Sequence, residues 1–174
     1  ALRKRLGAHV KQAGSIVTPE LLRFDFSHFE AVKPEELKDI ENMINEKIWS
    51  NDGVKKEVMP KDQAIARGAI AMFGEKYGDQ VRVVSVGDYS TELCGGCHVN
   101  QSSDIHLFKI VSESSITAGV RRVIAYTSKG AYEYLRSRND MLGSLKDAVK
   151  AQTIEEIPSR IEKMGENEKA LKRK

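Results

Sequence analysis

The start of the chain has the pattern of a short helix followed by extended segments. Leu2 and Leu6 lie four residues apart and precede Gly7, which is typical of the last turns of a helix that ends at glycine. Ile16 and Val17 lead to a Thr-Pro turn signal, and residues 22–26 alternate apolar with charged side chains. This alternation predicts a half-buried strand.

Two further segments have the pattern of amphipathic helices. The first begins at Pro34 and has apolar residues at positions 37, 40, 44 and 48, before it ends near Trp49. A proline in the first turn, followed by two glutamates, is typical of a helix N-terminus. A shorter helix is predicted from Pro60 to just before Gly68.

Between residues 69 and 126 the pattern changes to short β-rich runs that are separated by glycines. We predict strands at residues 69–73, 81–86, 89–93, 105–111 and 120–126. Strands that follow a helix without regular strand-helix alternation indicate an α+β fold. We therefore expect a mainly antiparallel sheet with packed helices.

From residue 131 onward helix-forming and charged residues predominate. Apolar residues recur at helical spacing, at positions 135, 142, 145 and 149 and again at 157, 161, 164 and 171. Pro158 is placed to start a new helix. The sequence thus predicts a domain of residues 1–130, followed by an α-helical hairpin at residues 131–174 that acts as a linker without chemistry of its own.

The composition is that of a folded protein with a hydrophobic core. Of the 174 residues, 40% are hydrophobic and 30% are charged, and no run approaches the roughly 18 apolar residues that a membrane helix needs. Two cysteines exclude a disulfide-rich secreted scaffold, so we expect a cytoplasmic protein with no membrane partner. Lysines and arginines number 28 against 25 acidic residues, an excess that permits a polyanionic partner without demanding one.

Both cysteines and one histidine lie within five residues, in the sequence CGGCH at 94–98. Cys-x-x-Cys-His is the attachment pattern of c-type haem, and Cys-x-x-Cys also occurs in redox dithiols. Haem attachment requires export, and a redox dithiol prefers a helix N-terminus after a βαβ pattern, which the glycine pair does not supply. Haem attachment and a redox dithiol are therefore the less favoured alternatives, and a metal site and a purely structural role are the other two.

In a metal site, the glycine pair lets the backbone bend so that Cys94 and His98 face one ion. A thiolate and an imidazole suit zinc, which takes four tetrahedral donors. Two donors are then missing. The remaining soft donors show no second paired spacing; they are Cys97, His9, His28 and His106.

A longer set of motifs surrounds this cluster. Residues 73–79 read FGEKYGD, 81–84 read VRVV and 87–99 read GDYSTELCGGCHV. The motifs HVKQAGS, RFDFSH, LFKIVSES and AGVRR occur at 9–15, 23–28, 107–114 and 118–122. Over about residues 1–130 the chain closely resembles the editing domain of the alanyl-tRNA synthetase family, and the helical remainder resembles the segment that follows this domain.

The resemblance implies the fold of the threonyl/alanyl-tRNA synthetase second additional domain, without its first helix. It also implies hydrolysis of the ester in mischarged seryl- or glycyl-tRNA(Ala). An alanine pocket needs such correction because one methyl or hydroxyl group is worth only about 1–3 kcal/mol of discrimination. The whole enzyme of this family ligates alanine to tRNA(Ala) with ATP and magnesium, and no motif for that reaction occurs in these residues.

The resemblance also assigns site residues. Cys94 and His98 correspond to two zinc ligands of the family, and Gln12 matches the glutamine of its aminoacyl pocket, so these three are the expected catalytic residues. The metal is expected to order the attacking water and polarise the ester. Arg121 and Arg122 are candidates for phosphate contacts with the tRNA(Ala) acceptor end.

The family's other two zinc ligands form a His-x-x-x-His pair that would stand before Ala1. We therefore expect an incomplete zinc site and weak or absent hydrolysis by this fragment. Two alternatives stay open. One is a freestanding trans-editing deacylase, against which the helical tail argues, and the other is a non-catalytic tRNA-binding module of the same fold.

Overall fold

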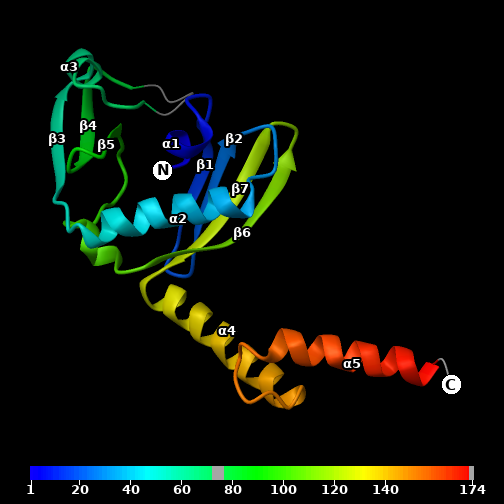
Figure 1. Ribbon diagram of the computed structural model, residues 1–174. Helices are drawn as coiled ribbons and strands as arrows, with labels where there is room; N and C mark the ends of the chain where they lie inside the picture. Colours follow the sequence, from blue (N-terminus) through cyan, green and yellow to red (C-terminus); the bar gives the residue numbers. More distant parts are fainter. Residues whose placement is uncertain (72–76, 173–174) are drawn as a thin grey trace. The chain divides into compact units, whose positions relative to one another are not determined.

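The computed structural model describes residues 1–71 and 77–172. The chain divides into two units, Ala1–Ala131 and Tyr132–Lys174, and the first holds both sheets (Figure 1). No helix among the described residues is long and apolar enough to cross a membrane. The predicted α+β class is confirmed, with two antiparallel sheets.

The larger sheet has four antiparallel strands in the order β1-β2-β7-β6. Their bounds are β1 Gln12–Val17, β2 Leu22–Ser27, β6 Phe108–Thr117 and β7 Val120–Thr127. The strands predicted around residues 22–26 and 120–126 are therefore present and lie next to each other. The strand predicted at 105–111 begins three residues later, because residues 102–105 form a 3-10 turn, η1 (Ser102–Ile105), that ends at His106 with a φ of +61°.

The smaller sheet has the order β3-β4-β5, with β3 Val54–Pro60, β4 Gln80–Val86 and β5 Ser90–Leu93. Strands β4 and β5 were predicted, whereas β3 was not. The sequence VKKEVMP buries only Met59, so it lacks the alternation that marks a half-buried strand. The strand predicted at 69–73 lies partly outside the described residues, and within them Ile70 forms an isolated bridge to Glu92.

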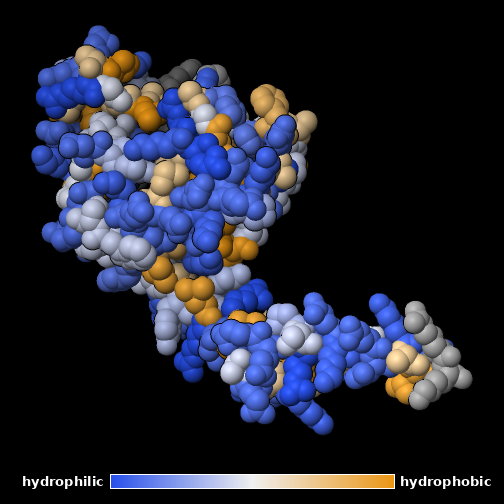
Figure 2. Space-filling model, in the orientation of Figure 1, coloured by the Kyte–Doolittle hydropathy of each residue, from blue (hydrophilic) through white to orange (hydrophobic). Residues whose placement is uncertain are grey.

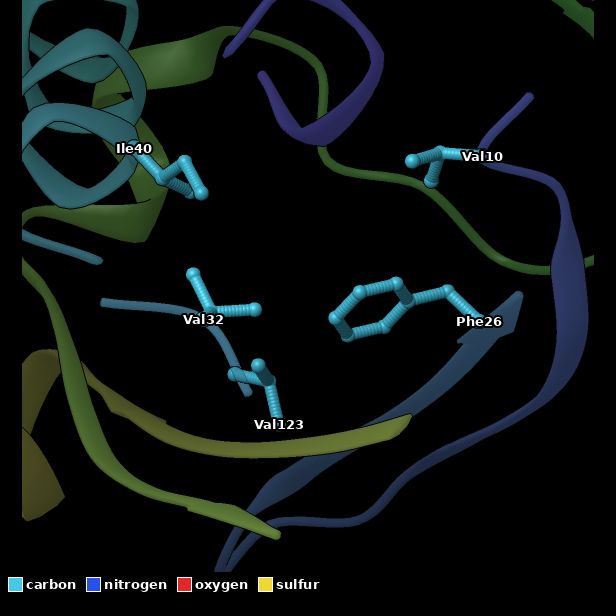
Figure 3. Close-up of a cluster of buried hydrophobic side chains, with 5 residues drawn as sticks. All are labelled: Val10, Phe26, Val32, Ile40 and Val123. Carbon is cyan, nitrogen blue, oxygen red and sulfur yellow. The ribbon is translucent and has the colours of Figure 1, made fainter. Parts of the chain in front are cut away.

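Three predicted helices are present in the first unit, α1 Leu2–Leu6, α2 Pro34–Trp49 and α3 Lys61–Ala66. Helix α2 lies across the four-stranded sheet (Figure 1) and buries its apolar side against it. Figure 3 shows five buried side chains of this core pointing toward one another: Val10, Phe26, Val32, Ile40 and Val123. The face in Figure 2 is mainly hydrophilic, with apolar residues in small patches.

Helix α2 also covers the open edge of strand β6. The amide of Asn45 donates to the carbonyl of Phe108 at 2.8 Å, and the Phe108 N–H donates back to Asn45 Oδ1 at 2.9 Å. Two residues further along β6, the Ile110 N–H donates to Glu41 Oε2 at 2.7 Å. Side chains thus satisfy backbone groups of this edge that a further strand would otherwise have to pair.

The two helices predicted for the tail are present as α4 Ser128–Ala148 and α5 Ile157–Lys172. Most of the apolar positions predicted for these helices are exposed. Leu135 and Leu142 on α4 are 40% and 42% exposed, and Ile161 and Met164 on α5 are 49% and 56% exposed, whereas Ile157 is buried. The described residues of this unit therefore bury only part of the predicted apolar pattern.

Candidate functional site

The CGGCH segment begins directly at the end of strand β5. Leu93, the last residue of β5, is buried in a core with Met59 and Val83, and the Cys94 N–H donates to the carbonyl of Arg82 at 3.1 Å. The sheet therefore fixes the backbone of Cys94. Beyond this residue the chain leaves the sheet, and Gly95 to His98 are exposed.

The Cys94 thiol and the His98 imidazole lie side by side. The distance between His98 Nε2 and Cys94 Sγ is 3.2 Å, with Cys94 half-buried and His98 exposed. The bend through the two glycines that the sequence predicts is present. It brings one sulfur and one nitrogen donor together on the surface.

A thiolate and an imidazole are a donor pair that zinc prefers, so the two residues fit that metal. They supply half of a tetrahedral set. The part of the chain that the structure describes holds no group of three or more histidine, cysteine, aspartate or glutamate side chains suited to one ion. Any further donors would have to come from elsewhere, and the assignment of Cys94 and His98 as ligands stays a prediction.

The surroundings of His98 favour its neutral form. Partial burial lowers the pKa of the imidazole below its ordinary value, and the positive charges of Arg82 and Lys56 lower this pKa further, while Glu92 acts in the opposite direction. A neutral imidazole keeps a lone pair, which is the form that binds metals. The lowered pKa thus favours the unprotonated imidazole, whereas the positive charges of Arg82 and Lys56 also oppose the binding of a metal cation.

Gln12 lies on the other sheet. It is the first residue of β1, half-buried and opposite Phe26 in the strand pairing. Among the described residues no hydrogen bond joins Gln12 to Cys94 or His98. The structure thus places Gln12 at the start of a strand, without a hydrogen bond to the donor pair, and its role in holding the aminoacyl end stays a prediction.

Arg121 and Arg122 lie on β7 and pair with carboxylates of neighbouring strands. Arg121 donates to both oxygens of Glu113 at 2.5 and 2.8 Å, and Arg122 donates to both oxygens of Asp25 at 2.7 and 2.8 Å. The hydrogen bonds from Arg122 lower the pKa of the Asp25 carboxyl below its ordinary value. The predicted tRNA contacts of both arginines remain untested, and the structure shows their charges paired within the sheet.

The contact between two histidines, His9 and His28, was not predicted from the sequence. His9 Nε2 and His28 Nδ1 are 2.9 Å apart, and the two rings stack with their centroids 5.2 Å apart. His9 precedes β1 and His28 follows β2, so the antiparallel pairing of these strands brings the rings together. Recognising β1 and β2 as a hairpin is the signal that could have found this pair.

The cleft with a volume of about 430 Å³ lies between α2 and the edge strand β6, away from the donor pair. Its lining includes Lys38, Glu41, Lys109 and Glu113. Lys109 Nζ donates to Glu41 Oε1 at 2.8 Å, so opposite charges in this cleft neutralise each other. None of the predicted site residues lines it.

Comparison with known proteins links the chain to tRNA synthetases. Residues 81–124, from β4 to β7, match the family described as the threonyl and alanyl tRNA synthetase second additional domain. An alanine-tRNA ligase of Shouchella clausii is 54% identical over 95% of this chain and 19% of that protein. Those of Ligilactobacillus salivarius and Bacillus subtilis are 53% and 55% identical, over 98% and 92% of this chain and 19% and 18% of the respective proteins.

The chain thus spans about a fifth of the length of the curated relatives it matches. Residues 81–124 include Cys94, His98, Arg121 and Arg122, whereas Gln12 lies outside the matched domain. The identities extend over almost the entire chain and so include both units. Residues 81–124 therefore match the second additional domain of the threonyl and alanyl tRNA synthetases, and almost the whole chain is similar to a segment of alanine-tRNA ligases, as the resemblance in its sequence predicted.

Proposed function

We propose that this chain is the editing part of an alanine-tRNA ligase and hydrolyses the ester that joins serine or glycine to tRNA(Ala). The observation that carries the proposal is the Cys94 Sγ to His98 Nε2 distance of 3.2 Å, at the end of a strand of the matched domain. The names of the relatives support the tRNA as substrate, since they are alanine-tRNA ligases. Because such enzymes act in translation, we place the activity in the cytoplasm.

Cys94 and His98 would hold zinc together with donors from outside the described residues. When bound, the metal supplies a Lewis acid that lowers the pKa of a water molecule and polarises the ester carbonyl. The protein's own residues bind and orient the substrate. In this proposal Gln12 holds the aminoacyl end and Arg121 and Arg122 contact phosphates of the acceptor end. The buried Leu93 at the end of β5 and the backbone hydrogen bond to Arg82 keep Cys94 in place.

The activity of the whole protein is also a proposal, because the chain covers about a fifth of its relatives. We propose that the parent enzyme ligates alanine to tRNA(Ala) with ATP and magnesium. Its alanine pocket distinguishes glycine or serine by only about 1–3 kcal/mol, so a second site that hydrolyses the wrong ester raises the accuracy of charging.

One observation favours a second candidate, a non-catalytic tRNA-binding module of the same fold. The described residues supply two soft donors to one site and no group of three or more. A module that only binds tRNA needs no complete metal site. The two candidates differ in one measurable property, which is ester hydrolysis that depends on the Cys94 thiol.

The test is a chimera in which this chain replaces the matching segment of the Bacillus subtilis alanine-tRNA ligase, to which it is 55% identical. We expect the chimera to deacylate seryl-tRNA(Ala), Cys94→Ala to abolish this hydrolysis, and Cys97→Ala to leave it intact. Cys97 is the matched control because it is an exposed cysteine of the same loop. Alanylation by each chimera confirms folding. Equal hydrolysis by Cys94→Ala and the parent chimera would exclude the role of the Cys94 thiol on which the proposal rests. Binding of tRNA without hydrolysis by the parent chimera would exclude editing and favour the binding module.

A further inference from the structure

We propose that Arg82 and Lys56 are positioning residues that hold the 94–98 loop in the bend that keeps Cys94 and His98 side by side. The hydrogen bonds of these two cations do not go to Cys94 Sγ or His98 Nε2. Arg82 instead donates to the backbone carbonyl of Cys94, and Lys56 donates to the backbone carbonyl of His98. This inference rests on the proposed function in one respect, that the donor pair serves to bind a metal.

Arg82 fixes the beginning of the loop. It lies half-buried on β4, and its guanidinium donates to the carbonyl of Cys94 at 3.1 Å and also to the carbonyl of Gly96. Its own carbonyl accepts the Cys94 N–H at 3.1 Å. The planar, always charged guanidinium is suited to holding two acceptors at once, so one residue ties both sides of Gly95 to the sheet.

Lys56 fixes the end of the loop from the neighbouring strand β3. Its ammonium donates to the carbonyl of His98 at 3.0 Å and to Asn100 Oδ1 at 3.0 Å. Next to it, the Val54 N–H donates to the carbonyl of Asn100 at 2.8 Å. The segment that carries His98 is therefore attached to β3 by side-chain and backbone hydrogen bonds.

The strand register places both cations on one face of the smaller sheet. Val58 pairs with Arg82 and Lys56 pairs with Val84, and side chains two residues apart share a face. Val83 pairs with Leu93, and both are buried on the opposite face. The loop thus lies on the side that carries the cations, away from this sheet's core.

The loop itself has little else to hold its shape. Gly95 and Gly96 are exposed and carry no side chain that could pack, and a Cβ added at Gly95 would meet nothing within 4 Å. Glycines gain conformational freedom that opposes a fixed bend. A metal site needs its donors held within a fraction of an ångström, so the hydrogen bonds from Arg82 and Lys56 supply the order that the two glycines lack.

The test compares Arg82→Gln and Lys56→Gln with controls that remove the same charge from the same sheet region. Arg67 is the control for Arg82, since its ion pair with Glu57, at 3.7 Å, lies away from the loop. Lys55 is the control for Lys56, because it is exposed on the next position of β3 and therefore on the opposite face. Arg82→Lys is the conservative variant, which keeps the positive charge and a donor nitrogen on a shorter side chain.

Two readouts report on the loop. The first is the affinity of the chimera for Co²⁺, measured from the thiolate-to-cobalt absorption band. The second is the amide hydrogen exchange of residues 94–98. We expect Arg82→Gln and Lys56→Gln each to weaken Co²⁺ binding about tenfold or more and to speed loop exchange, as loss of outer-shell contacts does in metal sites. Arg67→Gln and Lys55→Gln should match the parent chain, and Arg82→Lys should recover part of the loss.

The inference is overturned if Arg82→Gln and Lys56→Gln behave like their controls in both readouts. Thermal unfolding shows whether each variant folds. If Arg82→Gln does not fold, the comparison rests on Lys56→Gln and Arg82→Lys. Failure of the proposed function is a separate result. Even if the chimera hydrolyses no ester, Lys56→Gln should still show faster amide exchange in residues 94–98 than Lys55→Gln.

Discussion

Replacing Asp25 by asparagine should destabilise the larger sheet more than any comparable change of a surface carboxylate. Asp25 is 7% exposed on β2, and its oxygens accept hydrogen bonds from Arg122 Nε and Nη2 at 2.7 and 2.8 Å. Arg23 Nε lies 3.6 Å away, and this nitrogen is buried without a hydrogen-bond partner. The substitution leaves both arginines without a counter-charge.

The pair is only partly buried, because the Arg122 side chain keeps 29% of its surface exposed, so the loss should lie below that of a fully buried pair, at about 1–3 kcal/mol. At about 2–4 °C per kcal/mol for a domain of this size, the melting temperature should fall by about 2–12 °C. The matched control is Asp39→Asn, because Asp39 pairs with Arg5 at 2.8 Å but keeps 53% of its side chain exposed. That change should cost at most about 1 kcal/mol. Thermal unfolding followed by circular dichroism measures both.

The pH dependence checks the same pair. The hydrogen bonds from Arg122 hold the pKa of Asp25 below its ordinary value in the folded state. The unfolded chain therefore binds the proton at a higher pH than the folded chain, so the stabilisation is present above the unfolded pKa and is lost as the pH falls through the folded pKa. Asp25→Asn should flatten the acid limb of the stability curve. A melting temperature equal to that of Asp39→Asn, or an unchanged acid limb, would refute the reasoning.

Two further outcomes follow from the structure. Asn45→Ala should lower the free energy of unfolding by about 2–3 kcal/mol, because it leaves the buried N–H and carbonyl of Phe108 without their partner. Denaturant unfolding measures this loss, and Asn42→Ala is the control on the same helix. The isolated chain should retain far less zinc after dialysis than the whole Bacillus subtilis alanine-tRNA ligase, because its described residues offer two donors to one site; metal analysis by mass spectrometry measures the ratio, and equal zinc content would contradict this.

The sequence predicted the elements in which spacing and burial agree. Residues 34–49 show both a helical apolar spacing and an N-terminal proline, and they form α2 with Ile40 and Ile48 buried. Strand β3 was missed because its partners, not its own pattern, stabilise it: it is an exposed run of charges that pairs with the apolar strand β4. Backbone pairing of this kind leaves no periodic signal.

In the candidate site, the local contact was predictable from the sequence and the long-range contacts were not. The Cys94 and His98 pair was predictable because the two residues are four apart across a glycine bend, which is local information. The contacts of Arg82 and Lys56 were not, because they join residues separated by 12 and 42 positions and depend on the register of two strands. The pairing of His9 with His28 likewise depends on how β1 and β2 meet.

The position of Arg121 and Arg122 changes how their predicted tRNA contacts can work. Each arginine uses two N–H groups on one carboxylate, so the pairs Arg121–Glu113 and Arg122–Asp25 carry no net charge. Neutral pairs attract a distant polyanion weakly, because the two opposite charges cancel beyond a few ångströms. The remaining N–H groups still point away from the carboxylates and can donate to a phosphate at contact distance. If these arginines contact tRNA, they therefore select its orientation after it has arrived, and the long-range attraction has to come from other, exposed cations.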